Sequence, residues 1–149
     1  MRLHRLALPL FLFAAGTTFA QDVKPDRAIH YRQGVYAMIG WNFGPMGAMV
    51  KGEVPFDAAE FGKRAERVAW LSQQIEEGFP KGSDTGATTD AKPEIWQDWS
   101  DVTAKLSDFQ REAQALATVA KGGDEAAMKA QFVKTGGACK ACHDKYRAD

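Results

Sequence analysis

Apolar and small residues recur at alternating steps of four and three positions in four stretches of the chain. Such steps keep one row of side chains on one side of a 3.6-residue helix, so each stretch predicts a helix with one buried face. These four rows, which we call the inner stripes, run over residues 32–50, 61–79, 95–120 and 128–146. Their members are Arg32, Tyr36, Ile39, Phe43, Met46, Val50; Phe61, Ala65, Val68, Ser72, Ile75, Phe79; Ile95, Trp99, Val102, Leu106, Phe109, Ala113, Leu116, Ala120; and Met128, Phe132, Thr135, Cys139, Cys142, Tyr146. No strand-like alternation of polar and apolar residues competes with this pattern.

Residues typical of helix ends lie between the stripes. Asp57, with Glu60 three positions later, forms a capping-box pattern before the second stripe. Pro93 suits the first turn of the third helix, and residues 122–124 (Gly-Gly-Asp) combine a helix stop with an N-cap for the fourth. Residues 78–92, rich in Gly, Ser, Thr and Asp, form the one long loop. Helices joined in this way predict an all-α fold, an antiparallel up-down four-helix bundle.

Residues 1–20 have the pattern of a secretory signal. A short basic segment precedes an apolar run from Leu6 to Gly16, and small residues lead up to Ala20. The run is too short to span a bilayer core of roughly 30 Å, although an uncleaved membrane anchor is the alternative. We therefore expect export with removal of residues 1–20, and a single domain over residues 21–149.

Composition narrows the functional classes further. The 149 residues carry 19 Lys and Arg against 19 Asp and Glu, and 45% of the residues are hydrophobic. The length suits one domain with its own core. The charge balance provides no basic field for nucleic acid, and we expect no membrane association once the signal is removed.

The two cysteines stand directly before a histidine, as Cys139-x-x-Cys142-His143. This is the attachment pattern of c-type haem. Positions three apart on a helix lie on one face, about 5 to 6 Å apart, so two thiols can bond to the two vinyl groups of one haem. His143 can then reach the iron as its axial ligand, which predicts one covalent haem c. The alternatives are a redox-active dithiol, which lacks a surrounding βαβ pattern, and a disulfide, which a regular helix strains.

A second protein ligand to the iron has to come from upstream, because only six residues follow His143. Met128 lies about 22 Å away along the same helix. His30 is more typical of a solvated or capping residue, and the methionines of the first helix are displaced from Tyr36 along or around it. Tyr36 could lie over the haem, but a neutral phenol ligates iron poorly. We therefore expect a five-coordinate iron with a crowded open side, while a purely structural Tyr36 in the core remains the alternative.

The chain resembles the cytochrome c′ family over essentially all of residues 21–149. The resemblance rests on residues 139–147 at the C-terminus, 31–36 and 41–46 in the first helix, and 92–96 at the start of the third. It implies a homodimeric periplasmic haem protein of Gram-negative bacteria. It also implies a pentacoordinate, high-spin iron that binds nitric oxide and carbon monoxide.

The resemblance also implies roles for individual residues. Cys139 and Cys142 match the thioether residues and His143 the axial iron ligand. The other matched positions are Tyr36 and Phe79 for the distal pocket, Arg32, Gln33, Thr89 and Asp90 for the haem propionate edge, and Arg147 for the proximal side. Arg32 could instead be a surface cation, Asp90 a turn residue, and Arg147 a partner of the helix dipole.

Two functions fit this reading. The first is binding of nitric oxide and carbon monoxide, serving nitric oxide sequestration or tolerance, with electron transfer to an unidentified redox partner as an addition. The alternative is a six-coordinate, low-spin electron carrier of the same bundle family. We expect no enzymatic activity, since no distal His/Arg pair or acid–base group is evident. Apolar residues outside the first inner stripe, Met38, Trp41 and Met49, favour a homodimer through the first two helices.

Overall fold

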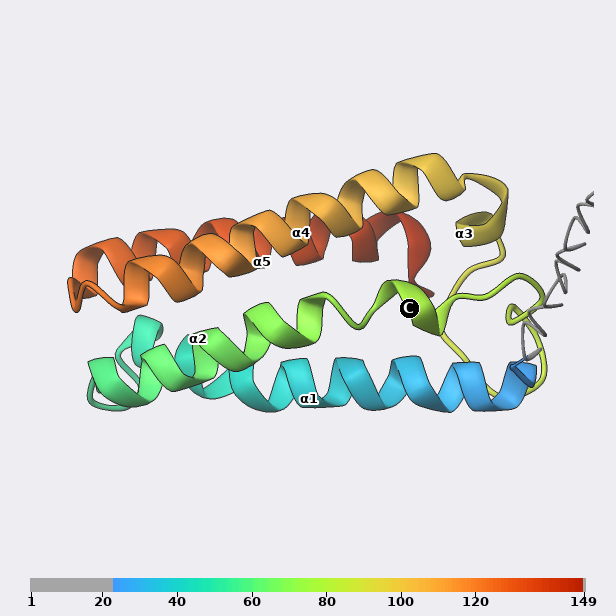
Figure 1. Ribbon diagram of the computed structural model, residues 1–149. Helices are drawn as coiled ribbons and strands as arrows, with labels where there is room; N and C mark the ends of the chain where they lie inside the picture. Colours follow the sequence, from blue (N-terminus) through green and yellow to red (C-terminus); the bar gives the residue numbers. More distant parts are fainter. Residues whose placement is uncertain (1–22, 149) are drawn as a thin grey trace, which may run out of the picture.

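Four long helices lie side by side in two layers, with α1 and α2 in one layer and α4 and α5 in the other (Figure 1). The computed structural model describes residues 23–148, so the predicted signal at 1–20 lies outside the described residues. The elements are α1 (Pro25–Lys51), α2 (Ala58–Ser72), the 3₁₀ turn η1 (Glu76–Gly78), α3 (Glu94–Gln97), α4 (Trp99–Ala120) and α5 (Glu125–Tyr146). The predicted all-α four-helix bundle is confirmed. None of the described helices combines the length and apolarity needed to cross a membrane.

Both predicted N-caps form. The Asp57 carboxylate accepts a hydrogen bond from the Glu60 amide at 2.9 Å, and the Asp124 carboxylate accepts one from the Ala127 amide at 3.1 Å. Each bond satisfies one backbone donor that the first turn of a helix leaves free. Gly123 before α5 adopts φ 73°, a left-handed conformation that favours glycine. The helix starts predicted at Asp57 and Asp124 are therefore confirmed.

The second helix is shorter than its stripe predicts. The stripe continues to Phe79, but α2 ends at Ser72, and the chain tightens into η1 before Phe79. The reason is a close approach to α1: a Cβ atom on Gly78 would lie only 2.6 Å from the Cβ of Arg32. The Gly78 carbonyl also accepts a hydrogen bond from the Arg32 guanidinium at 3.2 Å. Contact with α1 thus overrides the helical continuation, while Ile75 and Phe79 remain buried as predicted.

The third predicted helix is interrupted once. Asp98 has φ −121° and ψ 52°, which separates the short α3 from α4. The break lets Trp96 turn back toward the long loop, where its indole N–H donates to the Pro80 carbonyl at 3.1 Å. The Asp98 carboxylate in turn accepts a hydrogen bond from Lys145 of α5 at 2.9 Å. Both contacts are made with segments distant in sequence, so the local periodicity could not reveal the break.

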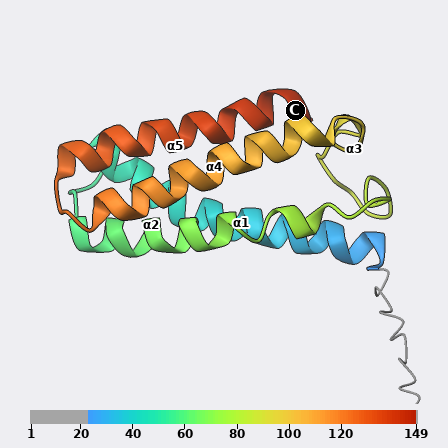
Figure 2. The ribbon, with the colours of Figure 1, turned by 45° about the horizontal axis from the view of Figure 1, so that its top comes forward.

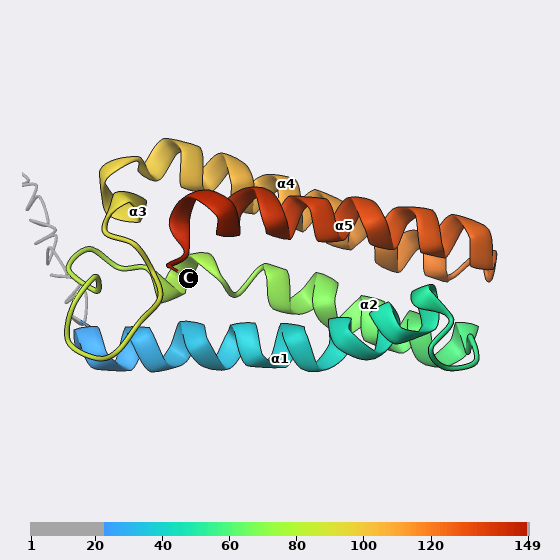
Figure 3. The ribbon, with the colours of Figure 1, turned by 180° about the vertical axis from the view of Figure 1, so that it is seen from behind.

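The long loop, residues 79–93, lies at the end of the bundle where α1 begins and α5 ends (Figures 2 and 3). Backbone hydrogen bonds join it to the end of α5. The Lys92 amide donates to the Tyr146 carbonyl at 2.9 Å, and the Ala148 amide donates to the Asp90 carbonyl at 2.7 Å. The loop and the chain end are thereby fixed beside the last turn of α5, which carries the Cys-x-x-Cys-His motif.

Candidate functional site

A cavity of about 590 Å³ lies at this end of the bundle, within the size range of pockets that enclose cofactors. Its walls come from α1, the segment around η1, the long loop, α4 and α5. The apolar part of the lining comprises Ala37, Ile39, Phe43, Ile75, Phe79, Ala91, Ile95, Val102, Leu106, Phe109 and Ala138. All the residues that the sequence nominates for the haem site also line it: Arg32, Gln33, Tyr36, Phe79, Thr89, Asp90, Cys139, Cys142, His143 and Arg147.

Cys139 and Cys142 lie one turn apart on α5, and both are half-buried free thiols at the cavity wall. Burial raises the pKa of Cys139 to about 11 and also raises the pKa of Cys142. Both groups are therefore neutral thiols near pH 7. Their common face fits attachment to two neighbouring substituents of one cofactor, and no disulfide links them.

His143 follows on the same helical turn and also lines the cavity. Desolvation, together with the Arg147 guanidinium, lowers the pKa of His143 below its ordinary value. The ring is therefore the neutral imidazole, the form that offers a nitrogen lone pair to a metal. The Tyr36 ring from α1 meets the His143 ring edge to face, with centroids 6.3 Å apart. Burial raises the pKa of Tyr36, so this side chain stays a neutral phenol.

Arg32 is only 2% exposed and is the hub of the polar edge of the cavity. Its guanidinium donates to the Gly78 carbonyl at 3.2 Å, to Ser83 Oγ at 3.1 Å and to Thr89 Oγ1 at 3.0 Å. Arg32 is therefore not a surface cation. It joins α1 to η1 and to the long loop, and its predicted contact with a haem propionate remains a prediction.

The other residues predicted for the cofactor edge lie close by. Gln33 Nε2 donates to the Thr88 carbonyl at 2.9 Å, which places the loop against α1. Arg147 pairs with Asp90 at 3.7 Å, and both side chains are exposed at the cavity rim. Asp90 therefore does more than form a turn, since it joins the loop to the chain end by both its backbone and its side chain. The structure thus brings together residues that lie far apart in the sequence.

Sequence reasoning missed a polar cluster that fixes the motif-bearing end of α5. Lys145 Nζ lies 2.9 Å from carboxylate oxygens of both Asp98 and Asp101, and the buried Tyr146 hydroxyl donates to Asp101 at 2.6 Å. Sequence reasoning also missed Lys105, which lines the cavity. Tyr146 belongs to an inner stripe, so its burial could be predicted. The two aspartates lie more than forty positions upstream and gave no local signal.

These residues fit a c-type haem. The donor set offers two thiols and an imidazole on adjacent turns of one helix, the chemistry needed for two thioether bonds and one axial iron bond. The walls are mostly apolar and aromatic, which suits the porphyrin faces. Three cationic side chains, Arg32, Lys105 and Arg147, also line the cavity, and cations of this kind could pair with the two carboxylates at the edge of a haem.

Comparison with known proteins decides the family. The family model described as "Cytochrome C'" matches residues 27–147. The chain belongs to the cytochrome c′ family. Its cofactor is accordingly a covalently attached haem c, and Cys139, Cys142 and His143 fit the attachment motif. The predicted family and cofactor are confirmed.

Individual members of the cytochrome c′ family resemble the chain over most of their length. The cytochrome c′ of Halomonas halodenitrificans is 40% identical over 131 residues, covering 85% of this chain and 99% of the relative. The solved cytochrome c′ of Shewanella frigidimarina is 50% identical, with a TM-score of 0.81, and the match covers 85% of this chain and 98% of that one. A carbon monoxide-bound variant of the cytochrome c′ of Alcaligenes xylosoxidans is 37% identical, with a TM-score of 0.78 and coverage of 85% and 98%.

Proposed function

We propose that this protein binds nitric oxide and carbon monoxide at a five-coordinate, high-spin haem iron and serves in nitric oxide sequestration or tolerance, without enzymatic turnover. The observation that carries the proposal is the pair of rings at the cavity. His143 supplies one axial ligand, and the side chain beside it is a neutral tyrosine rather than a second strong ligand. A haem held by these residues would supply an iron able to bind a neutral diatomic.

The positions of the methionines argue against the six-coordinate electron carrier. Met46, Met49 and Met128 are buried in the bundle core, and Met38 lies on the outside of α1. His30 is exposed. Over residues 23–148, the cavity lining contains no methionine and no histidine other than His143. A six-coordinate site of this kind would need a sulfur or a second imidazole at the position where Tyr36 lies.

Each side chain has a separate task in this mechanism. His143 would bind the iron from α5, and thioethers at Cys139 and Cys142 would hold the cofactor in place. The Tyr36 phenol, which lies beside His143, would crowd a ligand bound to the iron and so would disfavour bulky ligands relative to diatomics. The mostly apolar walls would pack against the cofactor. The solved nitric oxide and carbon monoxide complexes of Alcaligenes xylosoxidans cytochrome c′ variants support the proposal.

The absorption spectrum of the purified, reduced protein tests this function. We expect a broad high-spin Soret band that sharpens when carbon monoxide is added, because the open axial position becomes filled. A low-spin spectrum that does not respond to carbon monoxide, or a methionine–iron charge-transfer band in the oxidised protein, would support the electron carrier instead.

We further propose a periplasmic homodimer that associates through α1 and α2. The signal pattern of residues 1–20 supports the location. On α1, Trp41 is 78% exposed and Met38 is 48% exposed, and exposed apolar groups of this size favour a partner surface. Met49, which the sequence placed with them, is buried in the core at 7% exposure and belongs to the fold instead.

Replacing Trp41 by alanine is expected to shift the dimer toward monomer, because the indole is the largest exposed apolar group on α1. Light scattering across a dilution series measures the mass. Val133→Ala is the matched control, since Val133 is also exposed but lies on α5. A monomeric wild-type protein at every concentration, or equal weakening by both substitutions, would contradict this interface.

A further inference from the structure

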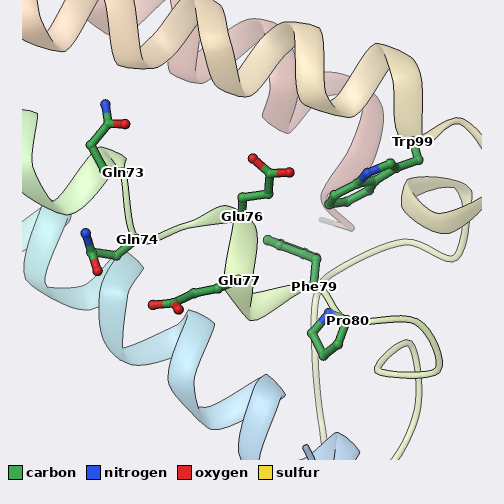
Figure 4. A pocket seen from close by; sticks show the side chains of 7 residues that line it. All are labelled: Gln73, Gln74, Glu76, Glu77, Phe79, Pro80 and Trp99. Carbon is green, nitrogen blue, oxygen red and sulfur yellow. The ribbon is translucent and has the colours of Figure 1, made fainter. Parts of the chain in front are cut away.

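A second hollow lies on the outer surface beside the haem cavity. This depression, of about 490 Å³, occupies the interval between the end of α2 and the start of α4 (Figure 4). Its lining consists of Gln73, Gln74, Glu76, Glu77, Phe79, Pro80 and Trp99. Of the described residues, only Phe79 lines both the depression and the cavity. The Phe79 side chain therefore separates the surface from the interior at this point.

The depression follows from the shortened second helix. The backbone tightens directly after Ser72, where the Gln73 and Gln74 amides donate to carbonyls only three residues back, at 3.2 and 3.0 Å. The chain then turns through η1 toward α1. Had α2 continued regularly to Phe79, its last turns would fill the space beside α4. The irregular segment leaves a hollow with Phe79 at its inner boundary.

Phe79 is held in a closed position by its neighbours. Its side chain is 8% exposed, and its ring centroid lies 5.9 Å from that of Trp96 and 6.5 Å from that of Trp99. The Arg32 guanidinium lies over the ring at 5.0 Å from the centroid, an attractive cation–π arrangement. Arg32 is itself fixed by its three hydrogen bonds to η1 and the loop. The lining residue that the two hollows share is thus an aromatic side chain packed against Trp96, Trp99 and Arg32.

We propose that neutral diatomic gases reach the cavity through this depression and that Phe79 controls the rate of their passage. This inference rests on the proposed gas-binding function and adds the route. Glu76 and Glu77 line the outer hollow, so small anions are disfavoured there relative to uncharged molecules. Because Phe79 lines both hollows, displacement of its ring is the movement that this proposal requires to join them. Phe79 thereby sets kinetic access, whereas Tyr36 acts on the bound ligand.

The proposal makes a distinctive kinetic claim. A side chain that only obstructs a path raises the same barrier for molecules going in and coming out. Lowering that barrier accelerates association and dissociation by one factor and leaves the dissociation constant unchanged. A wall that touches the bound gas changes the dissociation constant instead.

The test uses the haem-loaded protein and the variants Phe79→Leu and Phe79→Ala. Flash photolysis of the carbon monoxide complex measures rebinding from solution and escape from the cavity. We expect both to accelerate by about tenfold in Phe79→Ala, equivalent to about 1.4 kcal/mol of barrier, with a dissociation constant within about twofold of wild type. Phe79→Leu covers the case in which the alanine variant does not fold. In Phe79→Leu we expect rebinding and escape to accelerate by one shared factor that is smaller than in Phe79→Ala. The matched control is Phe109→Leu, a buried aromatic of the cavity wall that does not line the depression.

Xenon-pressurised crystals provide a readout that does not depend on the iron, because xenon occupies small apolar cavities. Xenon sites on both sides of Phe79, joined by a further site in the alanine variant, support the route. A protein that binds no carbon monoxide would overturn the gas-binding function and the route together. Carbon monoxide binding with unchanged rates in both Phe79 variants, or an equal common acceleration in Phe109→Leu, would overturn the route alone.

Discussion

Replacing Cys139 and Cys142 together by alanine is expected to abolish covalent attachment of the haem while α5 still forms. Both thiols lie on the face of α5 that lines the cavity, and no other cysteine occurs in the chain. Alanine has the highest helix propensity, so neither substitution disfavours the helix. Haem staining after denaturing electrophoresis, or extraction into acidified organic solvent, measures the attachment, and circular dichroism measures the helix content.

The single variants provide the internal comparison. Cys139→Ala and Cys142→Ala should each retain one thioether. One vinyl group of the haem then stays unreacted, which should shift the absorption of the haem in alkaline pyridine. Lys140→Ala, between the two cysteines on the exposed side of α5, should leave attachment unchanged. Haem that stays bound through denaturation in the double variant would show that the linkage is made elsewhere.

Replacing Tyr36 by alanine is expected to produce the second large effect, a rise in carbon monoxide affinity. The phenol ring lies beside His143 at the cavity, where it would crowd a ligand on the open side of the iron. Relief of crowding worth about 1–3 kcal/mol corresponds to about 5- to 150-fold in affinity. Titration of the reduced protein with carbon monoxide measures this change as a lower dissociation constant.

Tyr36→Phe separates crowding from hydrogen bonding. The ring remains and only the hydroxyl is lost, so we expect an affinity close to wild type. Burial already keeps the phenol neutral, and ionisation of Tyr36 does not enter this comparison. Unchanged affinity in Tyr36→Ala would assign Tyr36 to the core and remove it from the ligand site.

The motif and the helices of the bundle could both be predicted from the sequence because each depends on spacing within one stretch of the chain. Spacing along one helix places Cys139, Cys142 and His143 on adjacent positions whatever the surrounding fold. The inner stripes follow from the 3.6-residue repeat, and the caps at Asp57 and Asp124 act within one turn. The site residues that were matched by resemblance also line one cavity.

The tertiary structure decided where the helices stop and what the polar edge does. The second stripe ran to Phe79, but the contact of Gly78 with Arg32 ended α2 at Ser72 and created the outer depression. The break at Asp98 and the pairing of Asp98 and Asp101 with Lys145 and Tyr146 join residues more than forty positions apart. The Arg32 guanidinium likewise donates hydrogen bonds to Ser83 and Thr89, and the local sequence around Arg32 does not predict either partner. Helical periodicity reports which side of a segment is buried, whereas the partner against which it packs depends on contacts between distant segments, and those contacts set the helix ends and the access to the cavity.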